Sequence, residues 1–202
     1  MVGATGSNMS SVRDAIILAG GNGSRMLPAS LYLAKEALPL VDTPILNHLV
    51  WEASKAGVSR IHIILSKRKM ELLEQFLEFG SIFEENVRTD LPREALELGI
   101  RGVEIIPHLQ SSPGGVADAI SVALSEIKGP FLVLLGDNLL MDSHVGPKLS
   151  GRKNGSNASK ILVERFEISG VPNVGVWPVR RSEVEKYGVV ELSENKVLSI
   201  VE

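Results

Sequence analysis

The sequence of 202 residues contains no cysteine, which excludes disulfide bonds and thiolate metal sites. It also lacks any apolar run near the roughly 20 residues that a membrane-spanning helix needs. The formal net charge is only −3, so no broad cationic surface for nucleic acid is expected. Residues 1–12 are small and polar without the apolar segment of a signal peptide, and we expect a flexible tail there. Together these absences favour a soluble, cytoplasmic protein without nucleic-acid or membrane partners.

The apolar residues that are present gather in short runs. Runs suited to buried strands occur at 15–19, 60–65, 103–107 and 130–135. Helical spacing follows at about 44–56, at 66–79 and in the segment that ends near 127. Buried strands that alternate with helices predict an α/β fold, with a doubly wound, mostly parallel, Rossmann-like sheet covered by helices on both faces.

The first apolar run leads directly into three glycines. Gly20, Gly21 and Gly23 let the backbone approach a ligand with no Cβ in the way. Two cations follow, Arg25 and Lys35, so backbone N–H groups and positive charge together suit a polyphosphate. The spacing fits neither the GxGxxG pattern nor the Walker pattern, and the glycines alone are equally compatible with an ordinary turn.

Polar residues also follow two later strands. Gln110 comes after the third strand, and Asp137 comes directly after the fourth. The carboxyl ends of parallel strands form the ligand crevice of such sheets, so we expect both residues to face the glycine turn. A carboxylate there is costly unless it is paired or bound to a cation, and Mg²⁺ suits Asp137, although a turn cap is the simpler alternative.

The stretch from residue 20 to residue 39 resembles the signature of the sugar-1-phosphate nucleotidylyltransferases, which is G-G-x-G-[ST]-R-L-x-P followed by P-K-x-x-L-P. Here it reads GGNGSRMLP at 20–28 and AKEALP at 34–39. Two positions depart from the family pattern. Met26 replaces a leucine of similar volume, and Ala34 replaces a proline, which loosens the backbone ahead of Lys35.

Two further motifs are similar to those of the same family. Gln110, with Gly115 five residues later, resembles its base-reading loop, and a glutamine amide matches the paired donor and acceptor edge of uracil or thymine. Leu135–Asn138 resembles its metal motif, L-G-D-N. The hairpin expected from Tyr187 to Glu202 resembles its sugar-binding hairpin.

The resemblance implies a transferase that makes an NDP-sugar and pyrophosphate from dTTP or UTP and a sugar-1-phosphate, with glucose-1-phosphate as first choice and Mg²⁺ as cofactor. It implies catalytic roles for Arg25, Lys35 and Asp137, the last also as metal ligand. The implied nucleotide-binding residues are Leu18, Ala19, Gly20, Gly21, Gly23, Ser24, Gln110 and Gly115. The implied sugar-binding residues are Asn138, Tyr187, Gly188 and Glu202.

The family pattern continues beyond Glu202 with Lys-Pro and, later, a second metal-binding aspartate. We therefore keep a second hypothesis, a catalytically weak nucleotide- or nucleotide-sugar-binding regulatory module. A homo-oligomer is left open. The expected regions are the tail at 1–12, a nucleotide-binding core at 13–141 and a partial sugar-binding region at 142–202.

Several local predictions remain. Thr43 is expected to cap the helix that begins at Pro44. His62 is expected to be packed in its strand rather than catalytic, because no partner group is near it in sequence. Residues 67–69 are cationic and are expected to form a solvated face. Further strands are expected at 161–166 and 175–179, and an insertion at 80–102.

Overall fold

The computed structural model describes residues 10–40, 43–71, 102–141, 156–194 and 196–201. It divides the chain into two compact units, Met1–Gly170 and Val171–Glu202, and each is described by itself. The division falls later in the chain than the boundary expected near residue 141. The assignment of the two regions to nucleotide and sugar stays a prediction.

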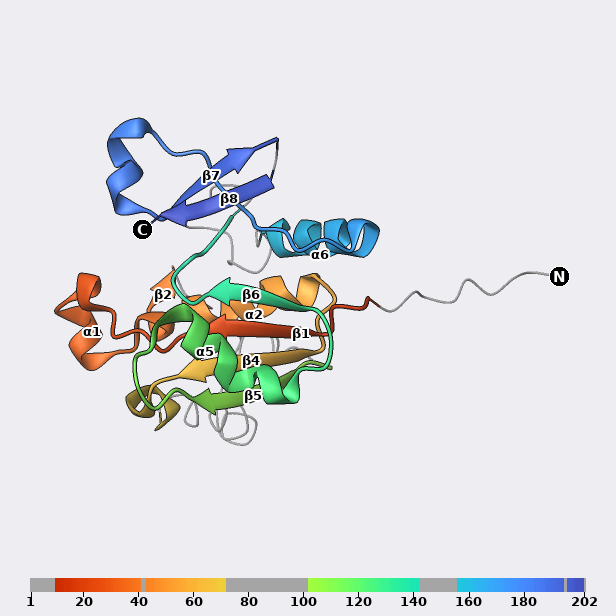
Figure 1. Cartoon of the computed structure of the whole chain (residues 1–202). Helices are drawn as coiled ribbons and strands as arrows, with labels where there is room; N and C mark the ends of the chain where they lie inside the picture. The colour runs from red at the N-terminus through yellow and green to blue at the C-terminus, as the bar shows by residue number, and fades with distance from the viewer. Residues whose placement is uncertain (1–9, 41–42, 72–101, 142–155, 195, 202) are drawn as a thin grey trace, which may run out of the picture. The chain divides into compact units, whose positions relative to one another are not determined.

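The first unit is built around four parallel strands in the order β5-β4-β1-β6 (Figure 1). The strands are β1 (Asp14–Leu18), β4 (Arg60–Leu65), β5 (Glu104–Leu109) and β6 (Phe131–Leu135). The pairing sets Leu18 opposite both Ile64 and Leu135, and Leu65 opposite Leu109. The carboxyl ends of all four strands therefore lie at one edge of the sheet, which confirms the predicted α/β class.

Each face of the sheet carries its own hydrophobic core. On one face, Ala15 and Ile17 of β1 pack with apolar residues of α2 (Ile45–Lys55) and with Val163 of α6 (Ala158–Ser169). On the other face, Ile16 and Ile64 pack with α5 (Gly115–Ala123), which Figure 1 shows lying across the strands. Because successive strand residues point to opposite faces and both faces are covered, β1 is apolar from Ala15 to Leu18 and largely buried.

The start of α2 differs from the prediction. Thr43 and Pro44 form the short strand β3, which pairs with β2 (Pro39–Leu40), and the helix begins at Ile45 with no side-chain cap. Because Thr43 is part of this strand pairing, it does not take the capping position that was predicted. The predicted end is close to the observed one, because Gly57 follows α2 with a φ of 91°.

The strand predicted at 161–166 is wrong, because this segment lies within α6. The run Ile161–Leu162–Val163 favours a strand by local preference, yet its buried positions have helical spacing. Val163 is buried, and Leu162 and Phe166 pack beside it. The helix ends at Gly170, whose φ of 65° suits glycine and whose N–H donates to the Phe166 carbonyl at 2.7 Å.

Residues 10–12 differ from the expected flexible tail. The side chain of Val12 is buried in the core beside α2 and α6. The Glu167 carboxylate of α6 accepts hydrogen bonds from Ser10 Oγ and Ser11 N, both at 2.7 Å. The hydroxyls of Ser10 and Ser11 thereby hold the pKa of Glu167 below its ordinary value.

Several short elements follow the glycine turn in the first unit. They are η1 (Ser24–Met26), α1 (Ala29–Tyr32) and η2 (Lys35–Ala37), and η3 (Leu124–Glu126) extends α5. Residues 67–71 are helical, as predicted. The rest of that helix and nearly all of the insertion at 80–102 lie outside the described residues.

The second unit contains η5 (Arg181–Lys186) and the antiparallel hairpin of β7 (Val189–Ser193) and β8 (Lys196–Val201). The hairpin confirms the strands predicted from Tyr187 onward. The strand expected at 175–179 is not formed, since the structure describes this segment without regular elements. Among the described residues, no helix is long and apolar enough to cross a membrane.

Candidate active site

The loops that follow the four strands meet at the carboxyl edge of the sheet. Backbone hydrogen bonds link the starts of these loops to neighbouring strands. Ala19 N donates to Ile64 O and Gly136 N donates to Leu18 O, both at 2.9 Å. Gly136 is packed so closely that a Cβ added to it would lie 2.4 Å from the Leu18 carbonyl oxygen. The loop after β6 is therefore fixed against the glycine turn after β1.

Lys35 and Asp137 are the first predicted pair that the structure brings together. Lys35 Nζ donates to Asp137 Oδ2 at 2.7 Å and lies 3.9 Å from Glu36 Oε1. The side chain of Lys35 is only 13% exposed, whereas that of Asp137 is 47% exposed. The site thus holds a cation and a carboxylate in contact, and the carboxylate lies on the side of solvent.

The buried side chain of Lys69 binds the backbone of the glycine turn. Its ammonium donates to the carbonyls of Ala19 at 2.7 Å and Gly21 at 2.6 Å, and to both oxygens of Glu36 at 3.0 and 2.8 Å. These acceptors use all three N–H donors of a lysine. Burial lowers the pKa of Lys69, and the hydrogen bond to Glu36 acts in the opposite direction.

This anchor orients the backbone of the turn. In a planar trans peptide the N–H points away from the carbonyl of the same unit. With the carbonyls of residues 19 and 21 directed at Lys69, the N–H groups of Gly20 and Asn22 point away from it. The turn therefore presents amide hydrogens on the side opposite the buried lysine, as an anion would require.

Gln110 lies against the same turn. A Cβ added to Gly20 would come within 2.7 Å of Gln110 Oε1, so a side chain at this position would require the Gln110 amide to shift. The other end of the amide donates to Asp118 Oδ2 at 2.7 Å. Because a carboxylate accepts and never donates when ionised, Asp118 fixes which end of the Gln110 amide faces the turn.

The remaining predicted residues of the first unit surround this edge. Leu18 and Ala19 end β1 and lead into the turn, and Ser24 is exposed at the start of η1. Gly23 has a φ of 68°, where a side chain would be strained. Arg25 lies within η1, and its side chain lies outside the described part of the structure. Gly115 begins α5, and Asn138 is exposed beside Asp137.

The predicted sugar-binding residues are divided between the two units. Asn138 belongs to the first unit, and Tyr187 and Gly188 belong to the second, where both are exposed. Glu202 lies outside the described residues. The grouping of these four residues around one sugar stays a prediction.

Sequence reasoning missed Lys69, Glu36 and Asp118. Lys69 was expected to be solvated, and this was wrong, because only 7% of its side chain is exposed and Glu36 neutralises it. A signal was available in Glu36, which stands beside Lys35 in a stretch that is apolar apart from these two residues, because a carboxylate needs a cationic partner if it is buried. Asp118 lies in the first turn of α5, where the helix dipole alone would favour a carboxylate, and it also binds Gln110.

The sheet and its loops define a doubly wound α/β protein whose candidate ligand site lies at the carboxyl ends of the strands. A glycine turn, a lysine and a carboxylate meet there, which suits a phosphate-bearing ligand. The sequence model of the nucleotidyl transferase family matches residues 14–202. The chain therefore belongs to the nucleotidyl transferase family, and the resemblance noted in its motifs is confirmed.

Individual relatives and solved structures agree with this membership. A UTP–glucose-1-phosphate uridylyltransferase of Streptococcus pyogenes is 34% identical over 185 residues, which cover 90% of this chain and 58% of the relative. A UDP-glucose pyrophosphorylase from Acinetobacter baumannii superposes with a TM-score of 0.78 at 26% identity, over 95% of this chain and 67% of that chain. The UTP-bound UGPase of that species gives 0.76 at 27% identity, with the same coverage.

Proposed function

We propose that this chain provides the nucleotide-binding and catalytic residues of a sugar-1-phosphate nucleotidyltransferase that uses a pyrimidine nucleoside triphosphate. UTP or dTTP and glucose-1-phosphate are the proposed substrates, and the names of the curated relatives favour UTP. The chain spans 58% of the length of the curated relatives that it matches. The observation that carries the proposal is the contact of Lys35 with Asp137 beside the glycine turn.

The proposed reaction is a single displacement at the α-phosphorus. A phosphate oxygen of the sugar-1-phosphate forms a bond to this phosphorus, and the bond from it to the pyrophosphate oxygen breaks. No covalent enzyme intermediate is needed, so positioning and charge stabilisation account for the rate. In this scheme Arg25 holds the β- and γ-phosphates, and Lys35 lies at the α-phosphate, where charge increases as the leaving group departs.

The residues at the strand ends also fit a magnesium ion. Asp137 offers hard carboxylate oxygens on a side chain that is 47% exposed, and Mg²⁺ prefers one or two carboxylates together with substrate phosphates. When bound, Mg²⁺ would neutralise part of the triphosphate charge. Lys35 would then exchange its contact with Asp137 for one with a phosphate oxygen, which conserves a charge-assisted hydrogen bond.

The nucleoside is proposed to lie between the glycine turn and the start of α5. Gln110, held by Asp118, would present its amide to the uracil or thymine edge, and the backbone at Gly115 would complete the contact. Asn138, Tyr187, Gly188 and Glu202 remain the proposed sugar ligands. The cytoplasmic location expected from the sequence stays a prediction.

The test is release of pyrophosphate by the full chain supplied with glucose-1-phosphate, Mg²⁺ and either UTP, dTTP, ATP or GTP. The proposal expects turnover with a pyrimidine nucleotide and its loss, by orders of magnitude, in Arg25→Ala. Arg165→Ala, an exposed arginine in α6, is the matched control and should turn over normally. Nucleotide binding in a thermal-shift screen without any turnover would favour the regulatory module instead.

A further inference from the structure

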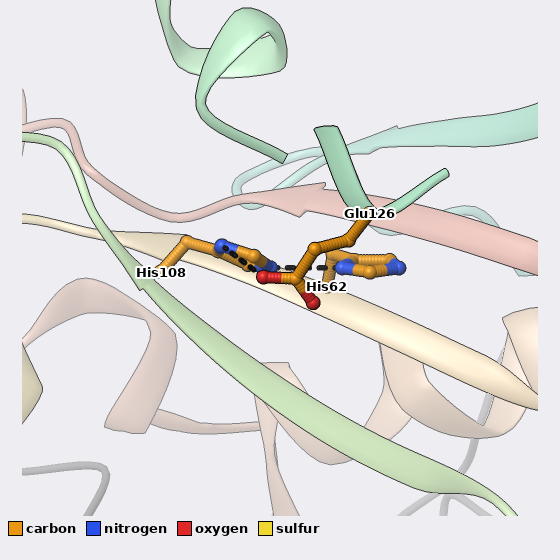
Figure 2. Close-up of side chains that lie close together, drawn as sticks. All are labelled: His62, His108 and Glu126. Carbon is orange, nitrogen blue, oxygen red and sulfur yellow. Dashed lines mark hydrogen bonds and ion pairs between the residues drawn. The ribbon is translucent and has the colours of Figure 1, made fainter. Parts of the chain in front are cut away.

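A second group of ligand-type side chains lies away from the strand-end site, on the face of the sheet that α5 covers. His62 of β4 and His108 of β5 are neighbours across two strands, and Glu126 reaches them from η3 (Figure 2). His62 Nδ1 lies 2.8 Å from His108 Nε2. Each of the three residues offers a ligand atom within 4.8 Å of the others.

The hydrogen bonds around His62 fix its tautomer. Its Nε2 lies 3.2 Å from Asp14 Oδ1, and a carboxylate can only accept, so the proton is on Nε2. The lone pair of Nδ1 is therefore directed at His108. Metal-binding histidines are usually supported in this way: a carboxylate accepts the N–H of one ring nitrogen, and the other ring nitrogen keeps its lone pair for the metal.

The charges around the pair favour a cation. Arg60 is 3.1 Å from Asp14 and 3.6 Å from Glu104, and Glu126 lies 4.0 Å from His108 Nδ1. Among these described groups the carboxylates outnumber the guanidinium, so neutral histidines leave a local excess of negative charge. Both histidines are buried, at 0% and 8% exposure. Burial lowers the pKa of His108, which disfavours its protonated form. A divalent ion would balance the excess without protonating either ring.

We propose that His62 Nδ1, His108 Nε2 and the Glu126 carboxylate form a binding site for a divalent transition metal, with Zn²⁺ as the reference ion. Two imidazoles and one carboxylate are typical zinc ligands, whereas Mg²⁺ prefers an all-oxygen shell. Tetrahedral Zn–N bonds of about 2.0–2.1 Å place the two nitrogens about 3.3 Å apart, so the rings must separate by about half an ångström. The remaining coordination position would be taken by water.

Binding there would require a change of tautomer in His108. Its Nε2 proton, now shared with His62, would move to Nδ1 on the side of Glu126. The metal would join β4, β5 and η3, and so would fix both ends of the segment from 108 to 126. That segment contains Gln110 and α5. A metal bound by the residues that flank it would therefore restrict the motion of the proposed base-reading loop without contacting Gln110.

Equilibrium dialysis of the full chain against Zn²⁺, in excess Mg²⁺ and at a pH above 7, tests the proposal. One Zn²⁺ per chain is expected, and Co²⁺ in its place should give the visible absorption of a tetrahedral site with nitrogen ligands. His108→Gln should abolish binding, and Glu126→Gln should weaken it roughly tenfold or more. Glu104→Gln removes a carboxylate that contacts Arg60 but is no ligand, and should bind normally. Asp137→Asn should also bind normally, which separates this site from the strand ends.

The proposal is overturned if the wild-type chain takes up no Zn²⁺, or if His108→Gln takes up as much as wild type. Loss of the buried His108 side chain could impair folding, so the exposed Glu126→Gln variant and the wild-type chain provide independent readouts. In the ¹⁵N-histidine spectrum of the wild type, Zn²⁺ should shift Nδ1 of His62 and both ring nitrogens of His108, because the tautomer of His108 changes. Unshifted ring nitrogens at saturating Zn²⁺ would show that the two histidines are only a closed hydrogen-bonded pair.

Discussion

Lys35 Nζ and Asp137 Oδ2 are 2.7 Å apart, although 102 positions separate the two residues in the sequence. The contact joins η2 to the loop after β6 at the edge where all four parallel strands end. In the proposed reaction the nearly buried ammonium turns to a phosphate, and the half-exposed carboxylate that it leaves exchanges this ammonium for Mg²⁺. This exchange is the physical basis of the proposed Mg²⁺ dependence.

The variant Asp137→Asn should raise the Mg²⁺ concentration needed for half-maximal pyrophosphate release by roughly 10–100-fold, which corresponds to a charge-assisted contact of about 1.5–3 kcal/mol. The asparagine keeps the shape of the side chain and removes only the charge. Glu71→Gln, which neutralises an exposed carboxylate after β4, is the control and should leave the titration unchanged. An unaltered Mg²⁺ titration in Asp137→Asn would remove Asp137 from the metal site.

The variant Lys69→Met should lower both stability and activity, because it leaves the Glu36 carboxylate and two backbone carbonyls buried without their donor. Breaking a buried ion pair in this way costs about 3–5 kcal/mol. Lys67→Met, on the exposed side of the same helix, should have little effect on either quantity. Urea unfolding and pyrophosphate release measure the two effects.

A double variant separates the structural role of Lys69 from its role in the turn. Lys69→Met combined with Glu36→Gln removes both charges, so stability should recover in part. Activity should stay low, because the carbonyls of Ala19 and Gly21 still lack their common donor. Full recovery of activity in the double variant would mean that Lys69 serves only to neutralise Glu36.

The variant Gln110→Ala should reduce the preference for pyrimidine over purine nucleotides, measured as a ratio of kcat/KM values. The loss of a neutral hydrogen bond is worth about 0.5–1.5 kcal/mol, or roughly 2–10-fold in that ratio. Asp118→Asn should act in the same direction, because an asparagine can donate as well as accept and no longer fixes the Gln110 amide. Ser111→Ala, an exposed position in the same loop, is the control, and unchanged discrimination in Gln110→Ala would contradict the base-reading role.

The sequence predicted the parallel sheet and the meeting of its loops because the signals are local. Each apolar run marks a strand, and β1 leads into glycines at once. The Lys69 anchor could not be predicted in the same way, since its acceptors are 33 to 50 positions away and become neighbours only when the sheet forms. The strand prediction at 161–166 was wrong for a different reason. Residues 161–163 have the residue preference of a strand, whereas the contacts of this segment with the core follow helical spacing.

The variant Gly136→Ala should destabilise the fold, because its Cβ would lie 2.4 Å from the Leu18 carbonyl oxygen. The obstructing atom belongs to the backbone of the central strand, so relief requires β1 and β6 to move apart, at a cost of about 1–3 kcal/mol. At Gly129 an added Cβ would meet only the Ser11 oxygen at 3.8 Å, which is ordinary contact. Gly129→Ala is therefore the matched control in urea unfolding, and equal stability of the two variants would contradict the close packing at Gly136.

The attachment of residues 10–12 to α6 should depend on pH through Glu167. Hydrogen bonds from the hydroxyls of Ser10 and Ser11 hold the pKa of Glu167 below its ordinary value of 4.5. The unfolded chain therefore takes up the proton first as the pH falls, so this contact contributes fully above pH 4.5 and is lost as the pH falls through the lower, folded-state pKa. In hydrogen exchange, the amide of Ser11 should become several-fold less protected at the acidic end of this range. Glu167→Gln should remove most of that pH dependence, and Glu164→Gln, three residues earlier on the same helix, should retain it.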